Sequence, residues 1–242
     1  MTAAVLKLRR APAAPPTLEE RADAFDREAQ LLTPGEIVAA ALREFRGRIA
    51  LVSSFGAESA ALLHLVASVD PATPVLFIDT GKHFVQTNAY REELTDFLGL
   101  ANVLRIRPGE DEVSQSDAKG DLWRRDNDAC CSLRKVRPLS RALEGYDAWI
   151  TGRKRMHGSL RSFLPLVEAA PPHIKVNPLA RWSAADLENY ASAHGLPPHP
   201  LVENGFSSIG CWPCTAPTAP GDDARAGRWR GLAKTECGIH RL

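Results

Sequence analysis

The fold of this chain is decided by the stretch IALVSSFGAES at residues 49–59. Its first five residues are apolar and β-prone, which predicts a short strand that is buried on both faces. Small polar residues follow, and an apolar segment over 60–69 then suits a helix. A strand that leads into a helix through such a turn is typical of a βαβ unit in a parallel sheet.

The same alternation continues along the chain. Helices are expected over 17–32, from Thr33-Pro34 to about Phe45, and over 84–98, and further strands at 74–78, 103–106, 148–150 and 174–176. We therefore predict an α/β fold with a mainly parallel sheet and helices on both faces. The expected organisation is a flexible lead-in over 1–16, a nucleotide-binding α/β domain over 17–200 and an irregular C-terminal segment over 201–242.

Composition excludes several classes of protein. The 242 residues are 44% hydrophobic and 24% charged, which argues against disorder and coiled coil. The formal net charge of +1 argues against a protein that coats nucleic acid or a membrane by bulk charge. The apolar segment around 59–69 is shorter than the roughly 20 residues of a membrane span, and the first ten residues lack a secretory pattern. The chain is predicted to be cytoplasmic, with neither nucleic acid nor membrane as a partner.

Polar turns follow several of the expected strands. Residues 53–59, Asp79-Thr80-Gly81 and Thr151-Gly152 would all lie at the carboxyl edge of the sheet, where helix N-termini offer N–H groups to anions. Each turn alone is equally consistent with an ordinary connection. Between Arg134 and Arg161, however, the chain has eight Lys or Arg and two acidic residues, which favours recognition of a small anion over a solvated basic face.

Four of the five cysteines lie in two tight pairs, Cys130-Cys131 and Cys211-x-x-Cys214. In a reducing compartment such pairs indicate metal ligands or redox groups rather than disulfides. Four thiolates suit either zinc or an iron–sulfur cluster. The adjacent pair favours a [4Fe–4S] cluster, because neighbouring thiolates reach two irons of a cluster more easily than two corners around one ion. Zinc and four unligated cysteines remain the alternatives.

The fifth cysteine, Cys237, lies near the end of the chain with His240 three residues later and Arg225 and Arg228 upstream. Basic neighbours favour the thiolate, which is the nucleophilic form of cysteine. A terminal cysteine by itself is more often incidental. Its position after a cysteine-anchored, arginine-bearing segment favours a catalytic nucleophile.

Together these segments resemble the assimilatory sulfonucleotide reductases, in particular the iron–sulfur adenosine 5′-phosphosulfate (APS) reductases. The matching pieces span most of the chain after about residue 45, and their order is more specific than any one of them. The resemblance implies a Rossmann-like adenine-nucleotide α-hydrolase fold. It also implies that Cys237 takes the sulfo group from APS, that AMP leaves, and that thioredoxin or a similar dithiol protein releases sulfite in cysteine biosynthesis.

By the same resemblance each site residue has an expected role. Cys237, His240 and Lys135 are the expected catalytic residues, and the four paired cysteines are the expected ligands of a [4Fe–4S] cluster. The residues expected to bind the substrate are Ser53, Ser54, Phe55, Gly56, Ala57, Glu58, Ser59, Asp79, Thr80, Gly81, Gly152, Arg161, Arg225 and Arg228. The family pattern differs here at Gln86, Ile239 and Met156-His157, which leaves nucleotide contacts around 157–161 less defined.

Three alternatives share some of these features. A reductase for the 3′-phosphorylated nucleotide (PAPS) would use the same nucleophile but generally lacks the four cluster cysteines. An ATP-pyrophosphatase-type tRNA thiolation enzyme would carry a Ser-Gly-Gly-x-Asp-Ser loop, which residues 54–59 do not match. A redox sensor or interaction module could use the same cysteines without catalysis. A homo-oligomer is one option for the assembly, which the sequence leaves open.

Overall fold

The structure is a computed structural model that describes residues 14–158, 161–219, 221–232 and 234–241. Most of the predicted lead-in, residues 1–13, lies outside this part of the chain. The helices are α1 Leu18–Ala29, α2 Pro34–Glu44, α3 Ser59–Val69, α4 Val85–Leu98, α5 Glu110–Ser116, α6 Leu122–Arg125, α7 Asn127–Cys131, α8 Arg137–Leu143 and α9 Ala184–Ala193. The strands are β1 Ile49–Ser53, β2 Val75–Ile78, β3 Val103–Ile106, β4 Ala148–Ile150, β5 Val167–Ala170 and β6 His173–Val176.

The six strands form one sheet in the order β3-β2-β1-β4-β6-β5. All neighbouring pairs are parallel except β5 with β6, so an antiparallel strand closes one edge. The predicted strands at 49–53, 103–106 and 148–150 are confirmed with the same bounds. β5 was not predicted; its pairing with β6 shows that it belongs to the sheet.

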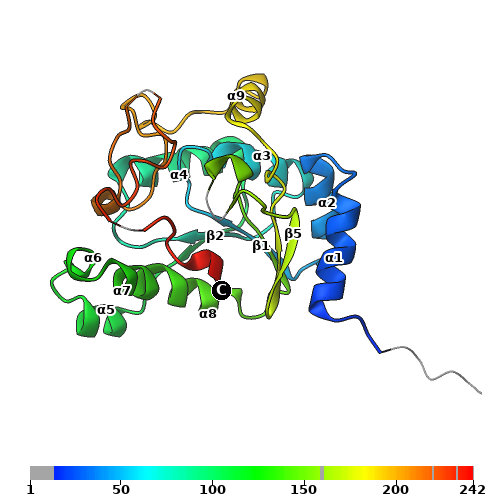
Figure 1. Ribbon diagram of the computed structural model, residues 1–242, viewed down its shortest axis with the longest axis horizontal. Coiled ribbons are helices and arrows are strands. Elements are labelled where there is room, and N and C mark those ends of the chain that lie inside the picture. The colour runs from blue at the N-terminus through cyan, green and yellow to red at the C-terminus, as the bar shows by residue number, and fades with distance from the viewer. Residues whose placement is uncertain (1–13, 159–160, 220, 233, 242) are drawn as a thin grey trace, which may run out of the picture.

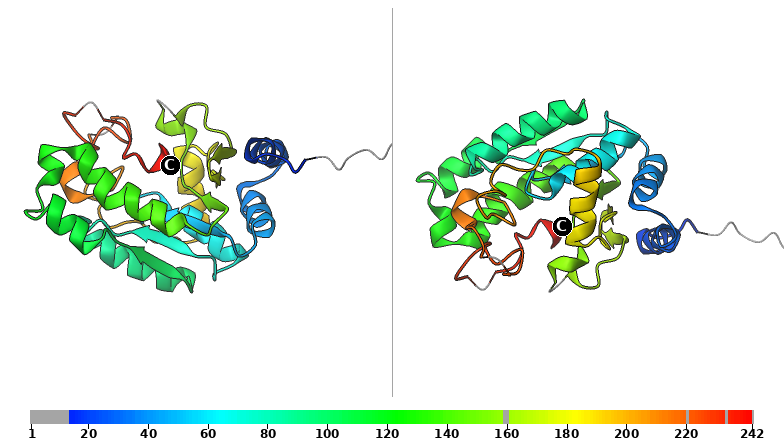
Figure 2. Two further views of the ribbon diagram at one scale, coloured as in Figure 1. Left: turned by 90° about the horizontal axis from the view of Figure 1, so that it is seen from below. Right: turned by 90° about the horizontal axis from the view of Figure 1, so that it is seen from above.

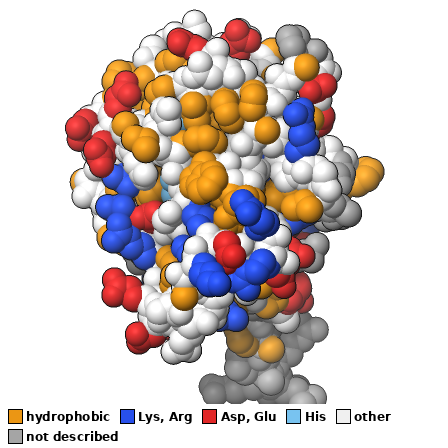
Figure 3. Space-filling model, turned by 90° about the vertical axis from the view of Figure 1, so that its left-hand side faces the viewer, with side chains coloured by type: hydrophobic (Ala, Val, Ile, Leu, Met, Phe, Trp, Pro, Cys, Tyr) orange, Lys and Arg blue, Asp and Glu red, His pale blue; other side chains and the backbone are white. Residues whose placement is uncertain are grey.

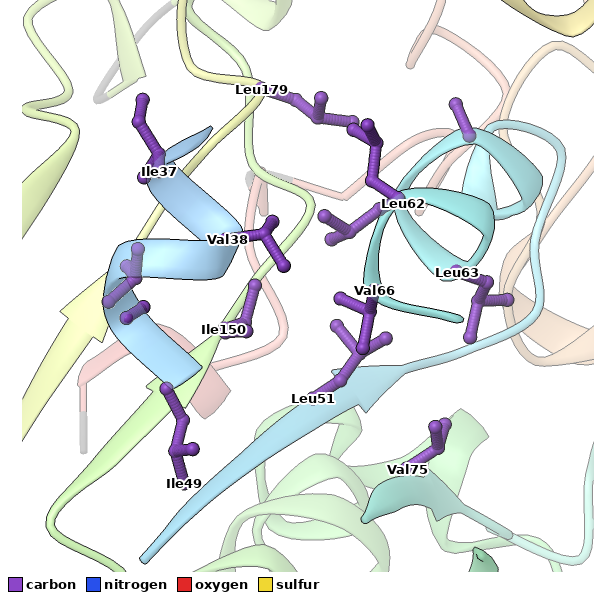
Figure 4. Close-up of a cluster of buried hydrophobic side chains, with 14 of the residues drawn as sticks. Ile37, Val38, Ile49, Leu51, Leu62, Leu63, Val66, Val75, Ile150 and Leu179 are labelled. Atoms are coloured by element: carbon purple, nitrogen blue, oxygen red, sulfur yellow. The ribbon is translucent and has the colours of Figure 1, made fainter. Parts of the chain in front are cut away.

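The sheet is covered on both faces, as predicted. On one face Leu51, Phe77 and Ile150 join the large apolar cluster formed with α1, α2, α3, α4 and α9 (Figure 4). On the other face Ala50, Leu76 and Trp149 pack against Leu139 and Leu143 of α8. Every residue of β1, β2 and β4 is buried, which explains their continuous apolar sequences.

The first two helices begin at capping boxes. The Thr17 and Thr33 hydroxyls accept hydrogen bonds from the backbone N–H groups of Glu20 and Glu36, whose carboxylates bond back to the cap residues. Figures 1 and 2 show α1 and α2 at one end of the molecule and the loop that carries Cys211 to Cys214 at the other. Helix and strand signals that are local in sequence therefore set most of the framework.

The described residues after Pro197 contain little regular structure, as their sequence predicted. Two short 3₁₀ turns, η4 Trp212–Cys214 and η5 Ile239–Arg241, lie in this segment. No helix in the described ranges combines the length and apolar character needed to cross a bilayer. Figure 3 shows acidic, basic and apolar side chains intermixed on one face of the molecule, consistent with the near-zero net charge.

Candidate active site

A cavity of about 210 Å³ opens where the strand order reverses. β1 lies between β2 and β4. The connection after β1 therefore leads to one side of the sheet, and the connection after β4 leads to the other side. This arrangement makes a crevice at the carboxyl ends of the strands, the usual ligand position in open α/β sheets. The cavity is lined there by the turn after β1, except for Phe55, and by Thr151 and Gly152 after β4.

The turn between β1 and α3 has a constrained backbone. Phe55 has φ of 48°, an uncommon value for a residue with a Cβ, and its fully buried ring meets Phe77 edge-on at 5.6 Å. A Cβ on Gly56 would lie 3.0 Å from the Ile209 carbonyl oxygen, so a larger residue would require the two segments to move slightly apart. The Gly56 N–H donates to the Ser59 hydroxyl at 2.8 Å, which fixes the start of α3. Aromatic packing and a glycine therefore shape the loop.

Cations surround the cavity, and most of them are paired. The Lys154 ammonium lies 2.7 Å from the Glu58 carboxylate, and Arg153 forms an ion pair with Glu168. Burial alone would raise the pKa of Glu58, but its hydrogen bond with His157 and the Lys154 charge lower it to about 2. Burial lowers the pKa of Lys154 despite the nearby carboxylate. The carboxylate of Glu58 thus stays ionised beside the cavity.

Several buried polar atoms at the cavity lack a protein partner. Arg153 Nε, Arg228 Nε and His240 Nδ1 have no hydrogen-bond partner among the described residues. All three residues line the cavity. Buried polar groups are almost always satisfied in native structures, so these atoms indicate that a polar ligand belongs in the cavity.

The C-terminal segment enters the same cavity. Glu236, Cys237 and His240 are all among its lining residues. The Arg161 guanidinium donates two hydrogen bonds to the Glu236 carboxylate, Nε to Oε1 at 2.6 Å and Nη2 to Oε2 at 2.8 Å. The His240 ring stacks on Trp149 with centroids 5.8 Å apart, and its backbone carbonyl accepts from the Lys175 ammonium at 2.9 Å. Contacts on either side therefore hold Cys237 inside the cavity.

Lys135 connects the cavity to the cysteines. It belongs to η1 Ser132–Val136, a turn of π-helix between α7 and α8, and it lines the cavity. Burial would lower the pKa of Lys135, but the nearby thiols of Cys211, Cys237 and Cys131 raise it. A charged ammonium is therefore held between the terminal cysteine and the two cysteine pairs.

The two cysteine pairs lie in segments that pack together. Cys130 and Cys131 are buried at the end of α7, and Cys211 is buried beside the turn after β2. The Asn127 amide donates to Cys214 Sγ at 3.2 Å, and the Thr80 hydroxyl lies 3.3 Å from Cys211 Sγ. The Trp123 and Trp212 rings meet at 5.9 Å.

Among residues 14–158, 161–219, 221–232 and 234–241, no three His, Cys, Asp or Glu side chains are grouped closely enough to hold a single metal ion. The donor set itself consists of four thiols from two facing segments. Cys130 lies near enough to Cys131 and Cys211 for their charges to raise its pKa, after the larger effect of burial. This chemistry fits a group that accepts four thiolates better than it fits oxygen-loving ions.

The structure brings most of the predicted site residues together. Lys135, Gly152, Arg161, Arg225, Arg228, Cys237, His240 and the polar residues of the β1 turn all line the one cavity. Asp79, Thr80 and Gly81 instead line a separate cavity, where the Asp79 carboxylate pairs with Arg105 and Arg107 at 2.6 and 2.9 Å. These three residues are not placed in contact with the main cavity.

Sequence reasoning missed other lining residues, including Trp149, His157, Ser207–Gly210 and Glu236, whereas Arg153 and Lys154 belong to the basic run that it singled out. One signal was available: Ser207-Ser208-Ile209-Gly210 comes directly before Cys211 and has the small polar composition of the β1 turn. The others reach the cavity through long-range folding. The Glu236 contact to Arg161, for example, joins residues 75 positions apart.

The fold is that of an α/β protein of the nucleotide-binding Rossmann-like type, with a cysteine-bearing tail at the crevice of its sheet. A family profile described as the phosphoadenosine phosphosulfate reductase domain matches residues 48–217. The chain belongs to this family, which confirms the resemblance read from its motifs.

Similar proteins extend over nearly the whole chain. A protein of Chelativorans sp. (strain BNC1) named adenosine 5′-phosphosulfate reductase is 50% identical over 232 residues, covering 94% of this chain and 95% of that protein. A protein of the same name from Mesorhizobium japonicum is 51% identical over 210 residues, covering 86% and 83%.

Solved structures support the fold. The phosphoadenylyl-sulfate reductase of Candida auris, solved as a phosphate complex, superposes with a TM-score of 0.70 at 26% identity, covering 84% of this chain and all of that chain. A Candida glabrata FMN adenylyltransferase superposes with a TM-score of 0.55 at 15% identity, covering 88% and 73%. The predicted fold class is confirmed.

Proposed function

We propose that this protein reduces adenosine 5′-phosphosulfate to sulfite and AMP, with electrons from thioredoxin or a similar dithiol protein. The observation that carries the proposal is the position of Cys237 in the cavity, beside Lys135 and the arginines that line it. The names of the bacterial relatives supply the substrate. A reductase of this kind is an oxidoreductase acting on a sulfur group.

In the first step the Cys237 thiolate attacks the sulfate sulfur of APS. An S–S bond forms, the bond from sulfur to the bridging phosphate oxygen breaks, and AMP leaves with that electron pair. Negative charge grows on the leaving phosphate, so the cations of Lys135, Arg161 and Arg228 would stabilise the transition state. Cys237 then carries an S-sulfo group.

In the second step a thiolate of the dithiol protein attacks Cys237 Sγ. Its new S–S bond replaces the bond to the sulfo group, and sulfite leaves with the electron pair. The second thiol of the partner resolves the mixed disulfide, which regenerates Cys237 and leaves the partner oxidised. Cys237 must be accessible for this step, so the terminal segment is expected to move out of the cavity.

Cys130, Cys131, Cys211 and Cys214 would hold a [4Fe–4S] cluster. Four thiolates and their arrangement as a vicinal pair and a C-x₂-C pair support this assignment over a single ion. When bound, the cluster supplies an electrostatic and structural centre rather than reducing electrons. Lys135 is the residue of this chain that lies between those cysteines and Cys237. The Ser53–Ser59 turn is proposed to hold the nucleotide. Asp79, Thr80 and Gly81 are proposed to support this turn indirectly, through the contact between the Thr80 hydroxyl and Cys211.

The test begins with anaerobic purification and iron and acid-labile sulfide analysis. The protein is then incubated with APS in the absence of a dithiol and analysed by peptide mass spectrometry. We expect one sulfo adduct on Cys237 and release of sulfite when thioredoxin is added. An adduct on another cysteine would contradict the proposed mechanism.

PAPS is the matched alternative substrate, because the family profile and the Candida auris structure carry its name. Parallel assays with APS and PAPS decide between them, and faster sulfite release from PAPS would replace the proposed substrate. We further propose a cytoplasmic location and treat residues 201–242 as a functional segment of their own on the α/β body of residues 17–200.

A further inference from the structure

We propose that Glu236 is a positioning residue whose carboxylate takes the place of the substrate's anionic group when no substrate is bound. This inference rests on the proposed function for the identity of the substrate. Arg161 binds Glu236 through two guanidinium nitrogens, Nε and Nη2, and the Arg225 Nη2 atom lies 3.6 Å from Oε2 of the same carboxylate. The same two arginines line the cavity that would receive the phosphosulfate group.

The geometry of this contact is that of an arginine binding a ligand. A guanidinium that donates two parallel hydrogen bonds to a carboxylate matches phosphate and sulfate oxygens equally well. The side chains of Arg161, Glu236 and Arg225 are 9%, 15% and 17% exposed, so the pair lies inside the cavity and not on its rim. An incoming dianionic group and the Glu236 carboxylate would compete for the same donors.

The charge of Glu236 supports competition. Burial would raise the pKa of Glu236, but the hydrogen bonds and charge of Arg161 and the charge of Arg225 lower it. Glu236 is therefore an anion while it is bound to these arginines. If a substrate anion joined it, two negative groups would share the same arginines. Displacement of Glu236 from the arginines removes this repulsion. Because Cys237 is the next residue, the same movement would also release Cys237.

The other contacts of the C-terminal segment explain why displacement of Glu236 need not unfold that segment. Ile239 packs against the apolar cluster of α8, and the His240 ring stacks on Trp149. Gly238 lies between these contacts and Cys237, with φ of 89°, a conformation that favours glycine. Exchange of Glu236 for a substrate anion therefore adjusts Cys237 about a fixed terminal anchor.

The test compares Glu236→Gln with Glu236→Asp, which keeps the charge, and with Glu203→Gln, an exposed carboxylate outside the cavity. AMP and inorganic sulfate are titrated calorimetrically into each purified protein. We expect Glu236→Gln to bind AMP about tenfold more tightly, equivalent to roughly 1.4 kcal/mol. Glu236→Asp should remain close to the unsubstituted protein, and Glu203→Gln should be unchanged. In APS turnover, Glu236→Gln should lower KM by a larger factor than it changes kcat.

A second measurement follows the Cys237 alkylation rate by peptide mass spectrometry. In the unsubstituted protein, saturating AMP should accelerate alkylation, whereas Glu236→Gln should react quickly with or without AMP. Unchanged AMP affinity in Glu236→Gln, or alkylation that AMP slows in the unsubstituted protein, would overturn the inference. Should Glu236→Gln not fold, the unsubstituted protein's response to AMP decides alone. A protein that forms no sulfite but meets these expectations would lose the proposed reaction and keep the anion exchange at Arg161.

Discussion

The sheet and the C-terminal segment are held together by different forces. Strands β1, β2 and β4 are buried throughout and are sealed between apolar helices. The segment after Pro197 has short 3₁₀ turns and is fixed by ion pairs, ring contacts and sulfur-bearing loops. The region that carries the framework and the region that carries Cys237 should therefore tolerate substitution differently.

This difference has a physical basis in what each contact can do. Apolar burial is non-directional and stabilises a fold roughly in proportion to area. Ion pairs such as Glu236 with Arg161 are directional and can exchange one anion for another. Substitutions in the sheet region should therefore lower stability, and those in the tail should lower activity with stability retained.

The largest expected effect is on catalysis. Cys237→Ser should lower sulfite formation at least about a thousandfold, equivalent to roughly 4 kcal/mol of transition-state stabilisation. The hydroxyl is a far weaker nucleophile than a thiolate, and Cys237 is not part of the apolar core. Initial rates with APS and thioredoxin measure the loss, with AMP binding and the urea midpoint as controls that should not change. Retention of a tenth of the activity would remove Cys237 from its role.

A core substitution should lower stability rather than catalysis. Leu94 of α4 is fully buried in the large cluster and lies outside the cavity lining. Leu94→Ala should lower the free energy of unfolding by about 3 kcal/mol, because it removes apolar contact and leaves a void. Leu94→Met, which keeps the volume, should cost less than about 1.5 kcal/mol. Urea unfolding measures both, and equal losses in the two variants would contradict the packing argument.

Acid should weaken the junction between the two regions through His199. This ring is fully buried, accepts a hydrogen bond from the Leu201 N–H at Nδ1, and contacts the Thr87 hydroxyl at 3.0 Å through Nε2. Burial lowers the pKa of His199 to about 4, although a hydrogen bond to the residue's own backbone opposes the shift. The unfolded chain binds the proton first, so stability is full above pH ~6.5 and falls as the pH drops toward 4.

The loss assigned to His199 is about 3 kcal/mol across that window. Other histidines, including His240, also have lowered pKa values, so the measurement is the difference between the unsubstituted protein and His199→Gln. Unfolding free energies at several pH values should converge for the two proteins at low pH. Parallel curves throughout would show that His199 does not titrate on unfolding.

The smallest expected effects are those of three glycine-to-alanine substitutions. Gly99 ends α4 with φ of 62° and has open space around it, so Gly99→Ala should cost about 1 kcal/mol of stability through backbone strain alone. Gly35→Ala in α2 should have the opposite sign by about 0.5 kcal/mol. Gly238→Ala, at φ of 89° and with a Cβ 3.4 Å from Val136, carries similar backbone strain but lies next to Cys237, so it should also reduce turnover. Thermal unfolding and initial rates distinguish the three, and full turnover in Gly238→Ala would argue against the comparison.

Most of the framework could be predicted because its signals are local. Apolar runs of strand length and capped helices indicated β1 to β4 and the helices α1 to α4. Several later elements were missed, and β5 and α9 show the physical reasons. β5 carries Glu168 and pairs only at the sheet edge, and α9 has a weak apolar face although Ser183 and Asp186 form a capping box.

The site was predictable in its chemistry and not in its contacts. The cysteine pairs, Cys237 and the basic run marked the reactive groups by residue type. The occupation of Arg161 by Glu236, and the placement of Asp79 beside Arg105, depend on segments brought together by the whole fold. Sequence periodicity carries no information about such pairings, so the separate cavity at Asp79 was not foreseen.

The π-helical turn at Ser132–Val136 has one further consequence. A wider turn accommodates one more residue than the α-helix allows, so everything after it is rotated by about 100° around the axis. Shortening this turn by a single residue would carry Lys135 away from the crevice while leaving the cysteines of α7 in place. Register along a helix, as much as residue identity, thus decides whether the ammonium faces the cavity.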